Sequence, residues 1–409
     1  MRILVHPHLM EIGGSQLNAL ELADAVGKAG HDVTVYAPAG ELDSVASSMA
    51  FDRVVAPPSG TWASVRNIRK LSQVAGSKEF DVVHAYEWGP SIDFTLGPHR
   101  ATSVPMVTTI LSMDVPDFLV RHEPLIVGTA ELLAEQAPTR ARTFLLEPPI
   151  NTDINTPCAD NSGARRQFGL VPTDIVIAVI CRLSTDLDKV VGVLQAIRVV
   201  DRLAEHSAVR LLVIGDGHGL TAVTTAAAEV NLRHDRDVII VAGGMTDPRP
   251  GYEAADIVIG MGSSALKGMA FAKPLVVQGA NDFWRLLDES SLPGFLVTGW
   301  FGHGGKGDED LHAGLSGLIA DKELRATLGS FGREVVVSRF SLRRAVDVQL
   351  AIYEAAIVDR PDRRTIDREV RRTAFEVAKF KVYMATKHRR EHLRPWLGRT
   401  RPREDALTH

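Results

Sequence analysis

Three short segments place glycine, hydroxyl or cationic residues at or directly after apolar stretches of strand length. The first spans residues 11–16 and contains the glycine pair Gly13 and Gly14. Paired glycines let the backbone approach a ligand closely, and a following helix would offer unpaired amide donors to an anion. The segment lacks the Gly-x-Gly-x-x-Gly spacing of a dinucleotide loop. It predicts either an anion site or a turn that needs glycine only for its geometry.

The second segment places two cations close together in the sequence. Arg182 follows the apolar stretch 174–181, and Lys189 stands at the start of the next helical stretch. A guanidinium group can grip two oxygens of a diphosphate while an ammonium group neutralises its charge. Such groups would also stabilise a departing nucleoside diphosphate as a sugar bond breaks. The alternative is that Lys189 is simply a solvated residue at a helix start.

The third segment covers residues 260–267 and leads into a short helix. Ser263 and Ser264 are candidate N-caps, and their amides and hydroxyls would form a small anion cradle. The alternative is a capped core helix without a ligand. A further glycine-rich turn, Gly-Asp-Gly-His-Gly, occupies residues 215–219, and such turns are common without function.

Several histidines could act as acid–base groups near neutral pH. His6, His8 and His84 fall near the ends of expected strands in the first half of the chain. Each is individually more often a hydrogen-bonded structural residue than a catalyst. The two cysteines, Cys158 and Cys181, lack metal-ligand spacing, and no His or Cys cluster in the sequence indicates zinc.

The elements that must position these groups alternate in two blocks. We expect strands at 2–5, 32–37, 81–85, 106–110 and 125–128, and then at 174–181, 209–214, 238–241, 256–260 and 274–278. Helices at 15–29, 190–203 and 220–231 separate them. Near-continuous apolar strands alternating with helices predict parallel sheets covered on both faces. The Pro-, Asn- and Asp-rich stretch 147–157 reads as a linker.

The sequence therefore predicts an α/β protein with two Rossmann-like, doubly wound lobes facing a cleft, plus a basic C-terminal helical tail. The expected lobes span residues 1–148 and 149–340, followed by a closing helix at 341–358 and the tail at 359–409. Open parallel sheets bind ligands beyond the carboxyl ends of their strands, so the cleft is the expected place for chemistry.

Composition narrows the class of protein further. Of the 409 residues, 45% are hydrophobic and 23% are charged, which is typical of a globular chain. No run of about 18 apolar residues indicates a membrane span. The low cysteine count favours a reducing, cytoplasmic location. Residues 359–409 carry 15 basic and 8 acidic groups, whereas the rest of the chain is acidic.

Taken in order, residues 1–357 resemble the family-4 retaining glycosyltransferases with the GT-B fold. The similar stretches are the glycine pair, Asp-Val-Val-His at 81–84, Pro-Ile-Asn-Thr-Asp at 149–153, Arg182 with Lys189 at a longer spacing, Leu-Leu-Val-Ile-Gly-Asp-Gly at 211–217, Ala-Ala-Asp at 254–256, Met-Ala at 269–270 and Lys-Pro at 273–274. The resemblance implies hexosyl transfer, with retained anomeric configuration, from a nucleoside-diphosphate sugar to an acceptor hydroxyl. The implied acceptor is a glycan or a lipid-linked or cell-envelope molecule.

The resemblance also implies roles for individual residues. The implied diphosphate site consists of Gly13, Gly14, Arg182, Lys189, Ser263, Ser264 and Lys267. The implied nucleotide site consists of Gly215, Asp216, Gly243 and Met245. His84 is the catalytic candidate from the first lobe, and the departing phosphate would itself accept the acceptor's proton. No metal and no cofactor are expected, since the fold family works without a metal.

Two residues depart from the family pattern. Lys267 replaces a glutamate that accepts hydrogen bonds from ribose hydroxyls, and an ammonium group can only donate. Ile110 stands where many members have a histidine near the transferred sugar. Lys267 would either attract the diphosphate or face solvent. These departures favour one alternative, a non-catalytic GT-B scaffold or partner protein. A nucleotide-sugar epimerase on the same fold is a further alternative.

The basic tail allows two interpretations. Aromatic and basic residues interleave over 370–383, and further basic clusters follow at 387–390 and 394. A basic amphipathic stretch of this kind is typical of docking to an anionic membrane surface. It would place the protein at the inner face of the membrane. Alternatively, the tail is solvated or packs back onto the acidic body. Nucleic acid is disfavoured as a partner because the body is acidic.

Overall fold

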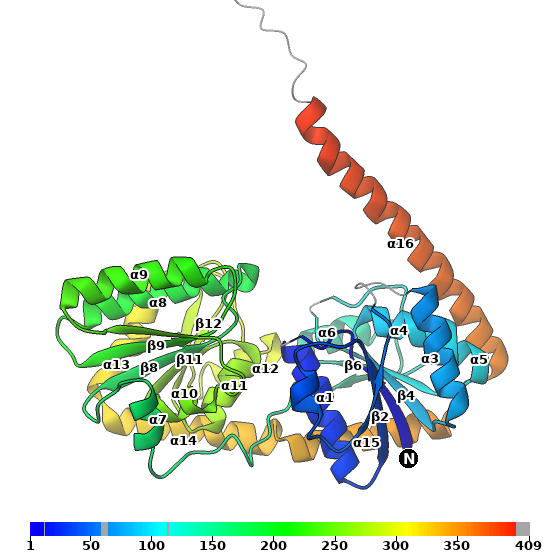
Figure 1. Cartoon of the computed structure of the whole chain (residues 1–409), viewed down its shortest axis with the longest axis horizontal. Helices are drawn as coiled ribbons and strands as arrows, with labels where there is room; N and C mark the ends of the chain where they lie inside the picture. Colours follow the sequence, from blue (N-terminus) through cyan, green and yellow to red (C-terminus); the bar gives the residue numbers. More distant parts are fainter. Residues whose placement is uncertain (12, 59–63, 113, 398–409) are drawn as a thin grey trace, which may run out of the picture.

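The computed structural model describes residues 1–11, 13–58, 64–112 and 114–397, with the side chains of 385–397 excluded (Figure 1). Two α/β lobes lie side by side, and a long C-terminal helix extends from the first of them. The predicted fold class, two Rossmann-like lobes followed by a helical tail, is confirmed.

The first lobe is built on a seven-stranded parallel sheet with the order β3-β2-β1-β4-β5-β6-β7. Its strands are β1 (Arg2–His6), β2 (Asp32–Ala37), β3 (Asp52–Val55), β4 (Val82–Tyr86), β5 (Met106–Ile110), β6 (Leu125–Val127) and β7 (Thr143–Leu145). Every residue of β4 and β5 is buried. Burial on both faces explains why these strands are continuously apolar instead of alternating.

The second lobe contains a six-stranded sheet with the order β10-β9-β8-β11-β12-β13. Its strands are β8 (Ile175–Ile180), β9 (Val209–Ile214), β10 (Ile239–Gly243), β11 (Ile257–Gly260), β12 (Leu275–Gln278) and β13 (Trp284–Leu286). Among the described strands of this sheet, only β13 pairs antiparallel. The strands β3, β7 and β13 were not predicted, because they are edge strands of three or four residues and carry little periodic signal.

Helices cover both sheets. Those between the first-lobe strands are α1 (Gly14–Lys28), α2 (Asp43–Ala46), α3 (Val65–Ser77), α4 (Trp88–Phe94), the π-helical turn η1 (Thr95–His99), α5 (Arg100–Thr102) and α6 (Ala130–Gln136). The second-lobe region contains α7 (Ser162–Gln167), the 3-10 turn η2 (Asp186–Asp188), α8 (Lys189–Leu203), α9 (Leu220–His234), α10 (Arg249–Ala254), α11 (Gly262–Ala270), α12 (Leu292–Thr298), α13 (Asp308–Ala320) and α14 (Lys322–Arg339).

The chain returns to the first lobe after completing the second. Helix α15 (Leu342–Val358) packs against α1, and its Ile352 and Tyr353 belong to the apolar core of the first lobe. The crossing is fixed where Ile150 pairs with Ser341 in an isolated parallel bridge. The first lobe is therefore completed by residues that follow the second lobe in sequence.

Helix α16 (Arg363–Leu397) continues on the first lobe and then projects away from it (Figure 1). Its buried residues Ile366, Val370, Thr373 and Val377 recur at helical spacing and form one stripe. The Thr373 hydroxyl donates to the Phe118 carbonyl at 2.7 Å. The first half of the tail thus packs back onto the body, which was one of the two interpretations. In the described part of the chain, no helix combines the length and apolarity needed to cross a bilayer.

Candidate functional site

Each sheet has a topological switch point, where strand order reverses and a ligand can enter between diverging loops. In the first lobe this point lies between β1 and β4, and in the second between β8 and β11. Because the neighbouring strands are parallel, their carboxyl ends share one edge of each sheet. The candidate site is defined by the residues at these two edges.

The second-lobe edge collects most of the predicted donor-site residues. Arg182 follows β8 and is exposed, Gly215 and Asp216 follow β9, Gly243 ends β10, and Ser263 opens α11 after β11. The Gly215 amide donates to the Gly243 carbonyl at 2.9 Å, so the ends of β9 and β10 are joined. The structure brings together residues that lie far apart in the sequence.

The glycines of the 215–219 turn are required by packing. A Cβ atom on Gly215 would lie 1.9 Å from the Cys181 carbonyl oxygen, and one on Gly217 would lie 2.4 Å from the Leu183 carbonyl oxygen. Gly217 also has φ of 143°, which disfavours other residues. The Leu183 amide donates to the Asp216 carbonyl at 2.8 Å. The turn therefore packs closely against the loop that carries Arg182 and is hydrogen-bonded to it.

The loop between Arg182 and Lys189 is strained. Leu187 and Asp188 both adopt left-handed backbone conformations, with φ of 54° and 55°, although neither is glycine. Such conformations cost roughly 1–3 kcal/mol each when the surrounding structure enforces them, and they concentrate at functional sites. Here the Asp188 carboxylate accepts from the Asn281 amide at 2.9 Å. The Lys189 ammonium donates to Asp186 at 2.5 Å, so Asp186 would compete with a diphosphate for this cation.

The helix α11 begins differently from the prediction. Met261 occupies the N-cap position, and the Ser264 hydroxyl accepts from the Met261 amide at 3.2 Å and donates to the Met261 carbonyl. The prediction that Ser263 or Ser264 is the N-cap is wrong, because the helix starts at Gly262. The hydroxyl of Ser264 closes its own turn, whereas Ser263 is exposed.

The first-lobe edge is formed by the start of α1 and by the loops after β4 and β5. Gly13 is the N-cap of α1, and Gly14 is its first residue. A Cβ atom on Gly14 would lie 3.7 Å from the hydroxyl oxygen of Ser263 in the second lobe. The start of α1 and the start of α11 therefore face one another across the lobe boundary.

Glu87 joins the first-lobe loops and was missed in the sequence analysis. One carboxylate oxygen accepts from the Leu111 amide at 3.0 Å, the Ser112 amide at 3.2 Å and the Ser15 hydroxyl at 3.2 Å. The other accepts from the Ser112 hydroxyl at 2.7 Å. Its backbone has φ of 69° and ψ of 180°, a conformation nearly confined to glycine. The position after a buried strand was the only sequence signal.

His8 lies close to this carboxylate. Burial lowers the pKa of the His8 imidazole below its usual value, while the negative charge of Glu87 opposes that shift. One ring nitrogen of His8 lies 3.3 Å from the side-chain nitrogen of Gln16 in α1. A neutral imidazole and a carboxylate therefore stand together at the first-lobe edge.

Lys267 stands between acidic groups of both lobes. Burial raises the pKa of Glu21 in α1, and the positive charge of Lys267 opposes that rise. Arg249 chiefly, with a contribution from Lys267, lowers the pKa of Asp247 in the second lobe. The Lys267 ammonium thus acts electrostatically on one carboxylate in each lobe, and its contact with a diphosphate stays a prediction.

The structure contradicts a catalytic role for His84. Its side chain is completely buried in β4. One ring nitrogen lies 2.7 Å from the Thr109 hydroxyl, and the other lies 2.7 Å from both the Tyr353 hydroxyl and the Gln349 amide nitrogen. Burial lowers the pKa of His84 to about 3. His84 therefore joins β4 to α15 inside the core and cannot reach a substrate at the sheet edge.

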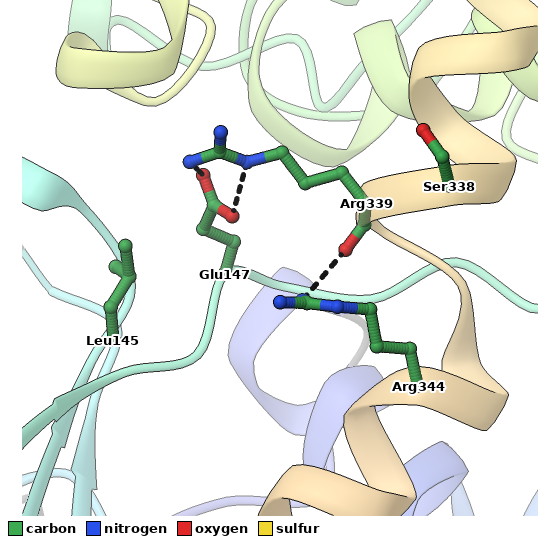
Figure 2. A pocket seen from close by; sticks show the side chains of 5 residues that line it. All are labelled: Leu145, Glu147, Ser338, Arg339 and Arg344. Atoms are coloured by element: carbon green, nitrogen blue, oxygen red, sulfur yellow. Dashed lines mark hydrogen bonds and ion pairs between the residues drawn. The ribbon is translucent and has the colours of Figure 1, made fainter.

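A pocket of about 290 Å³ lies elsewhere, where the chain crosses between the lobes (Figure 2). It is lined by Leu145, Glu147, Ser338, Arg339 and Arg344. Arg339 binds Glu147 through two hydrogen bonds of 2.9 and 3.1 Å. Arg344 donates to the Arg339 carbonyl at 3.1 Å. These contacts tie the two crossing segments together.

Comparison with known proteins agrees with this architecture. Residues 12–130 match the model of the family described as Glycosyltransferase Family 4. No curated protein sequence matches the chain. Among solved structures, a glycosyltransferase from Rickettsia africae ESF-5 is similar, with 15% identity and a TM-score of 0.70 over 88% of this chain and 99% of that one.

Two further structures have the same arrangement. Anabaena HepE, solved in complex with UDP, shares 17% identity and a TM-score of 0.67, covering 87% of this chain and 100% of its own. WaaG, a glycosyltransferase involved in lipopolysaccharide biosynthesis, shares 15% identity and a TM-score of 0.59, covering 85% and 99%. Together, these findings show that residues 12–130 match the Glycosyltransferase Family 4 model and that the chain as a whole has the two-lobed fold of these structures.

Proposed function

We propose that this enzyme transfers a hexosyl group from a nucleoside-diphosphate sugar to an acceptor hydroxyl with retention of anomeric configuration. The observation that carries the proposal is the approach of Gly14 in α1 to Ser263 in α11. This contact brings the starts of two helices, one from each lobe, to the same place. Helix N-termini present unpaired amides to anions, so a diphosphate held there would touch both lobes.

The second lobe supplies the groups for the donor. Arg182 would bind the diphosphate, and Lys189 would join it, although Asp186 competes for this cation. The loop ends at Gly215, Asp216, Gly243 and Met245 would surround the nucleoside. Anabaena HepE has been solved with UDP-glucose, and a starch synthase of the same fold with ADP. These printed ligands make UDP and ADP the first nucleotides to test.

The proposed reaction needs no enzymatic nucleophile. The bond between the anomeric carbon and the diphosphate oxygen breaks as the acceptor oxygen bonds to the same face of the sugar. The acceptor proton passes to the departing phosphate oxygen, so atoms and charge balance. Arg182 would stabilise the negative charge that develops on the leaving group. In this proposal two cations neutralise the diphosphate, and the transfer step requires no metal.

The first lobe is proposed to hold the acceptor. The carboxylate of Glu87 and the imidazole of His8 could receive hydrogen bonds from, or orient, a sugar hydroxyl. Both groups lie at the edge that faces the donor lobe. WaaG acts in lipopolysaccharide biosynthesis, which supports a glycan or lipid-linked envelope acceptor for this enzyme as well.

The experiment combines binding and turnover. Full-length protein is screened by thermal shift with UDP, GDP and ADP and with their hexose conjugates, and hits are then assayed for donor hydrolysis. We expect one nucleoside diphosphate to raise the melting temperature and its sugar to be hydrolysed slowly. Chromatography of the sugar product without acceptor separates transfer from epimerisation. Nucleotide binding without any turnover would favour the scaffold function instead.

We further propose that the distal part of α16 docks on an anionic membrane surface. Phe375 and Val382 are 68% and 65% exposed and lie seven residues apart, on one face of the helix. Lys379 and Lys381 accompany them. Exposed apolar residues beside cations are typical of interfacial helices. This would place the enzyme at the cytoplasmic face of the membrane.

Vesicle sedimentation tests the docking proposal. Removal of the whole tail would expose the buried stripe of α16, so the double variant Phe375→Ser/Val382→Ser is the better probe. We expect the unmodified chain to sediment with phosphatidylserine-containing vesicles and the variant to sediment less. Leu232→Ser, which changes an exposed leucine of α9, is the matched control. Equal sedimentation of all three proteins would contradict the proposal.

A further inference from the structure

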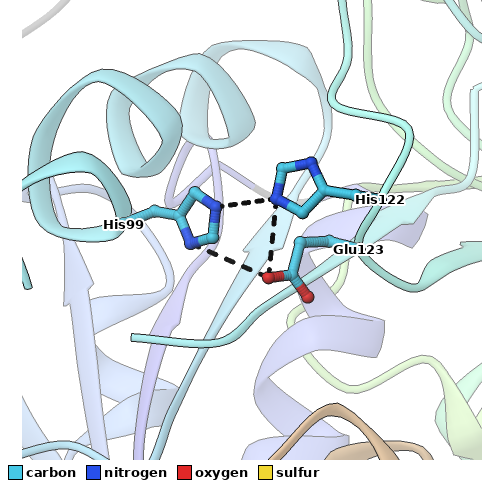
Figure 3. A group of neighbouring side chains, drawn as sticks. All are labelled: His99, His122 and Glu123. Atoms are coloured by element: carbon cyan, nitrogen blue, oxygen red, sulfur yellow. Dashed lines mark hydrogen bonds and ion pairs between the residues drawn. The ribbon is translucent and has the colours of Figure 1, made fainter. Parts of the chain in front are cut away.

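A second polar cluster lies in the first lobe, apart from the sheet edge that faces the second lobe. His99 is the last residue of η1, and His122 and Glu123 lie in the segment that leads to β6 (Figure 3). The three side chains point toward one another from these two segments. His99 and Glu123 are 0% and 2% exposed. The cluster therefore lies in the interior of the first lobe.

The ligand atoms of this cluster are close together. The Nε2 atoms of His99 and His122 are 3.0 Å apart, and the rings stack at 5.2 Å. A carboxylate oxygen of Glu123 lies 3.8 Å from His122 Nε2 and 3.8 Å from His99 Nδ1. One atom from each residue can be chosen so that all lie within 4.8 Å of one another.

The hydrogen bonds of the cluster leave polar atoms without partners. His99 Nδ1 lies 2.7 Å from the Val104 carbonyl, which can only accept, so Nδ1 carries the proton and Nε2 presents a lone pair. His122 Nε2 must then donate to it, which leaves His122 Nδ1 without a partner. Neither carboxylate oxygen of Glu123 has a hydrogen bond of good geometry, although the backbone amide of Met106 approaches the carboxylate. Buried polar atoms in this state are rare in native proteins.

We propose that His99, His122 and Glu123 bind a divalent transition-metal cation of the zinc class. The ligands would be the two Nε2 atoms and one Glu123 oxygen. Two imidazole nitrogens on a tetrahedral zinc ion are separated by about 3.3 Å, close to the spacing present here. The His99–Val104 hydrogen bond is the outer contact that fixes the tautomer of a metal-binding histidine. His122, with 10% of its side chain exposed, leaves access for a water as fourth ligand.

The position of the cluster indicates what the cation would do. Between β5 and β6, Ser112 is held by its bonds with Glu87, and Phe118 is held by the bond from Thr373 of α16. His122 and Glu123 follow shortly before β6. A cation shared with His99 would fix these two residues to η1. The inference concerns stability of the first lobe and does not depend on the proposed function.

The test uses the full chain after removal of metal by a chelator. We expect one equivalent of Zn²⁺ to bind per chain by elemental analysis after gel filtration, and to raise the melting temperature. The variants His99→Ala and Glu123→Gln should lose both effects. His206→Ala, which removes an exposed histidine beside Glu205, is the matched control and should retain them. Absence of stoichiometric zinc in the unmodified chain would overturn the proposal.

A spectroscopic test covers variants that fold poorly. Co²⁺ in a four-coordinate site gives strong visible absorption, and a thiolate ligand adds a charge-transfer band in the near ultraviolet. The variant His122→Cys keeps a metal ligand at position 122. We expect it to bind Co²⁺ with that added band. Co²⁺ spectra identical to those of aqueous Co²⁺ for both proteins would exclude coordination by this cluster.

Discussion

The two sides of the lobe boundary carry opposite kinds of groups. The second-lobe side has the cation Arg182 on a loop closed by glycine, and the cations Lys189 and Lys267 on helices α8 and α11. The first-lobe side has the carboxylates Glu21 and Glu87 and the imidazole of His8. The same sheet architecture thus provides a cationic edge in one lobe and an edge that accepts hydrogen bonds in the other.

This difference suits the two substrates of the proposed transfer reaction. A diphosphate is bound by cations and backbone amides, whereas sugar hydroxyls are bound by groups that accept hydrogen bonds. The contrast teaches that fold alone does not assign the roles, because both edges occupy equivalent topological positions. The side chains that follow each strand determine which substrate each edge can bind.

The largest effect is expected at Arg182. Arg182→Ala should lower kcat for donor hydrolysis about 10²–10³-fold, since it removes charge stabilisation of the leaving group. Steady-state kinetics with the nucleotide sugar found in the screen would measure this. Arg198→Ala is the control and should change kcat little. It removes an exposed arginine of α8 that pairs with Asp308 of α13. Equal kcat values for both variants would break the proposed division between the two edges.

His84 should affect stability and leave the chemistry intact. His84→Gln should lower the free energy of unfolding by about 1–3 kcal/mol, because Tyr353 and Thr109 lose a buried partner. Urea unfolding measures this loss, with His312→Gln as an exposed control. The pH dependence of kcat/KM of the folded variant should match that of the unmodified enzyme. A lost acidic limb in that profile would restore His84 as the catalytic base.

The sign of the pH effect follows from the buried state of His84. Its pKa is about 3 in the folded protein against 6.5 for the free side chain, so only the unfolded chain takes up this proton between pH 6.5 and 3. Stability therefore falls as the pH falls, by up to about 1.4 kcal/mol per pH unit from this group. His84→Gln should flatten that decline in acid unfolding curves.

Glu87 should show an intermediate effect. Glu87→Gln keeps the shape of the side chain but weakens the bonds to the Leu111 and Ser112 amides, which cost about 1–3 kcal/mol when lost. We expect lower thermal stability and a raised KM for the acceptor, with the nucleotide Kd unchanged. Glu229→Gln, an exposed change on α9, is the control. A raised nucleotide Kd would show that the first-lobe edge also binds the donor.

The smallest effect is expected at Lys267. Lys267→Glu replaces attraction to Glu21 by repulsion at a partly exposed position, which is worth less than about 1 kcal/mol. Nucleotide affinity should fall no more than about fivefold. Glu21→Gln in the same chain should restore part of it, as measured by titration calorimetry. Increased activity of Lys267→Glu would contradict the charge arrangement and support the ribose contact of the family pattern.

Much of the fold could be predicted because local chemistry determines it. The predicted strands at 32–37, 106–110 and 209–214 match β2, β5 and β9, since continuous apolar runs bounded by turns leave few alternatives. Gly13, Gly14 and Arg182 could be named because position after a buried strand is visible in a sequence. Edge strands such as β13 could not be predicted, because three residues are too few to show a periodic pattern of apolar side chains.

The sequence by itself determined which segments form strands and helices and which loops carry cations and glycines. Only the tertiary structure decided that His84 is enclosed by α15, that Glu87 joins three loops, and that His99 meets His122 and Glu123. The physical reason is that hydrogen bonding and burial depend on contacts between residues distant in the chain. Periodicity records which face is apolar, but it does not record which partner will cover that face.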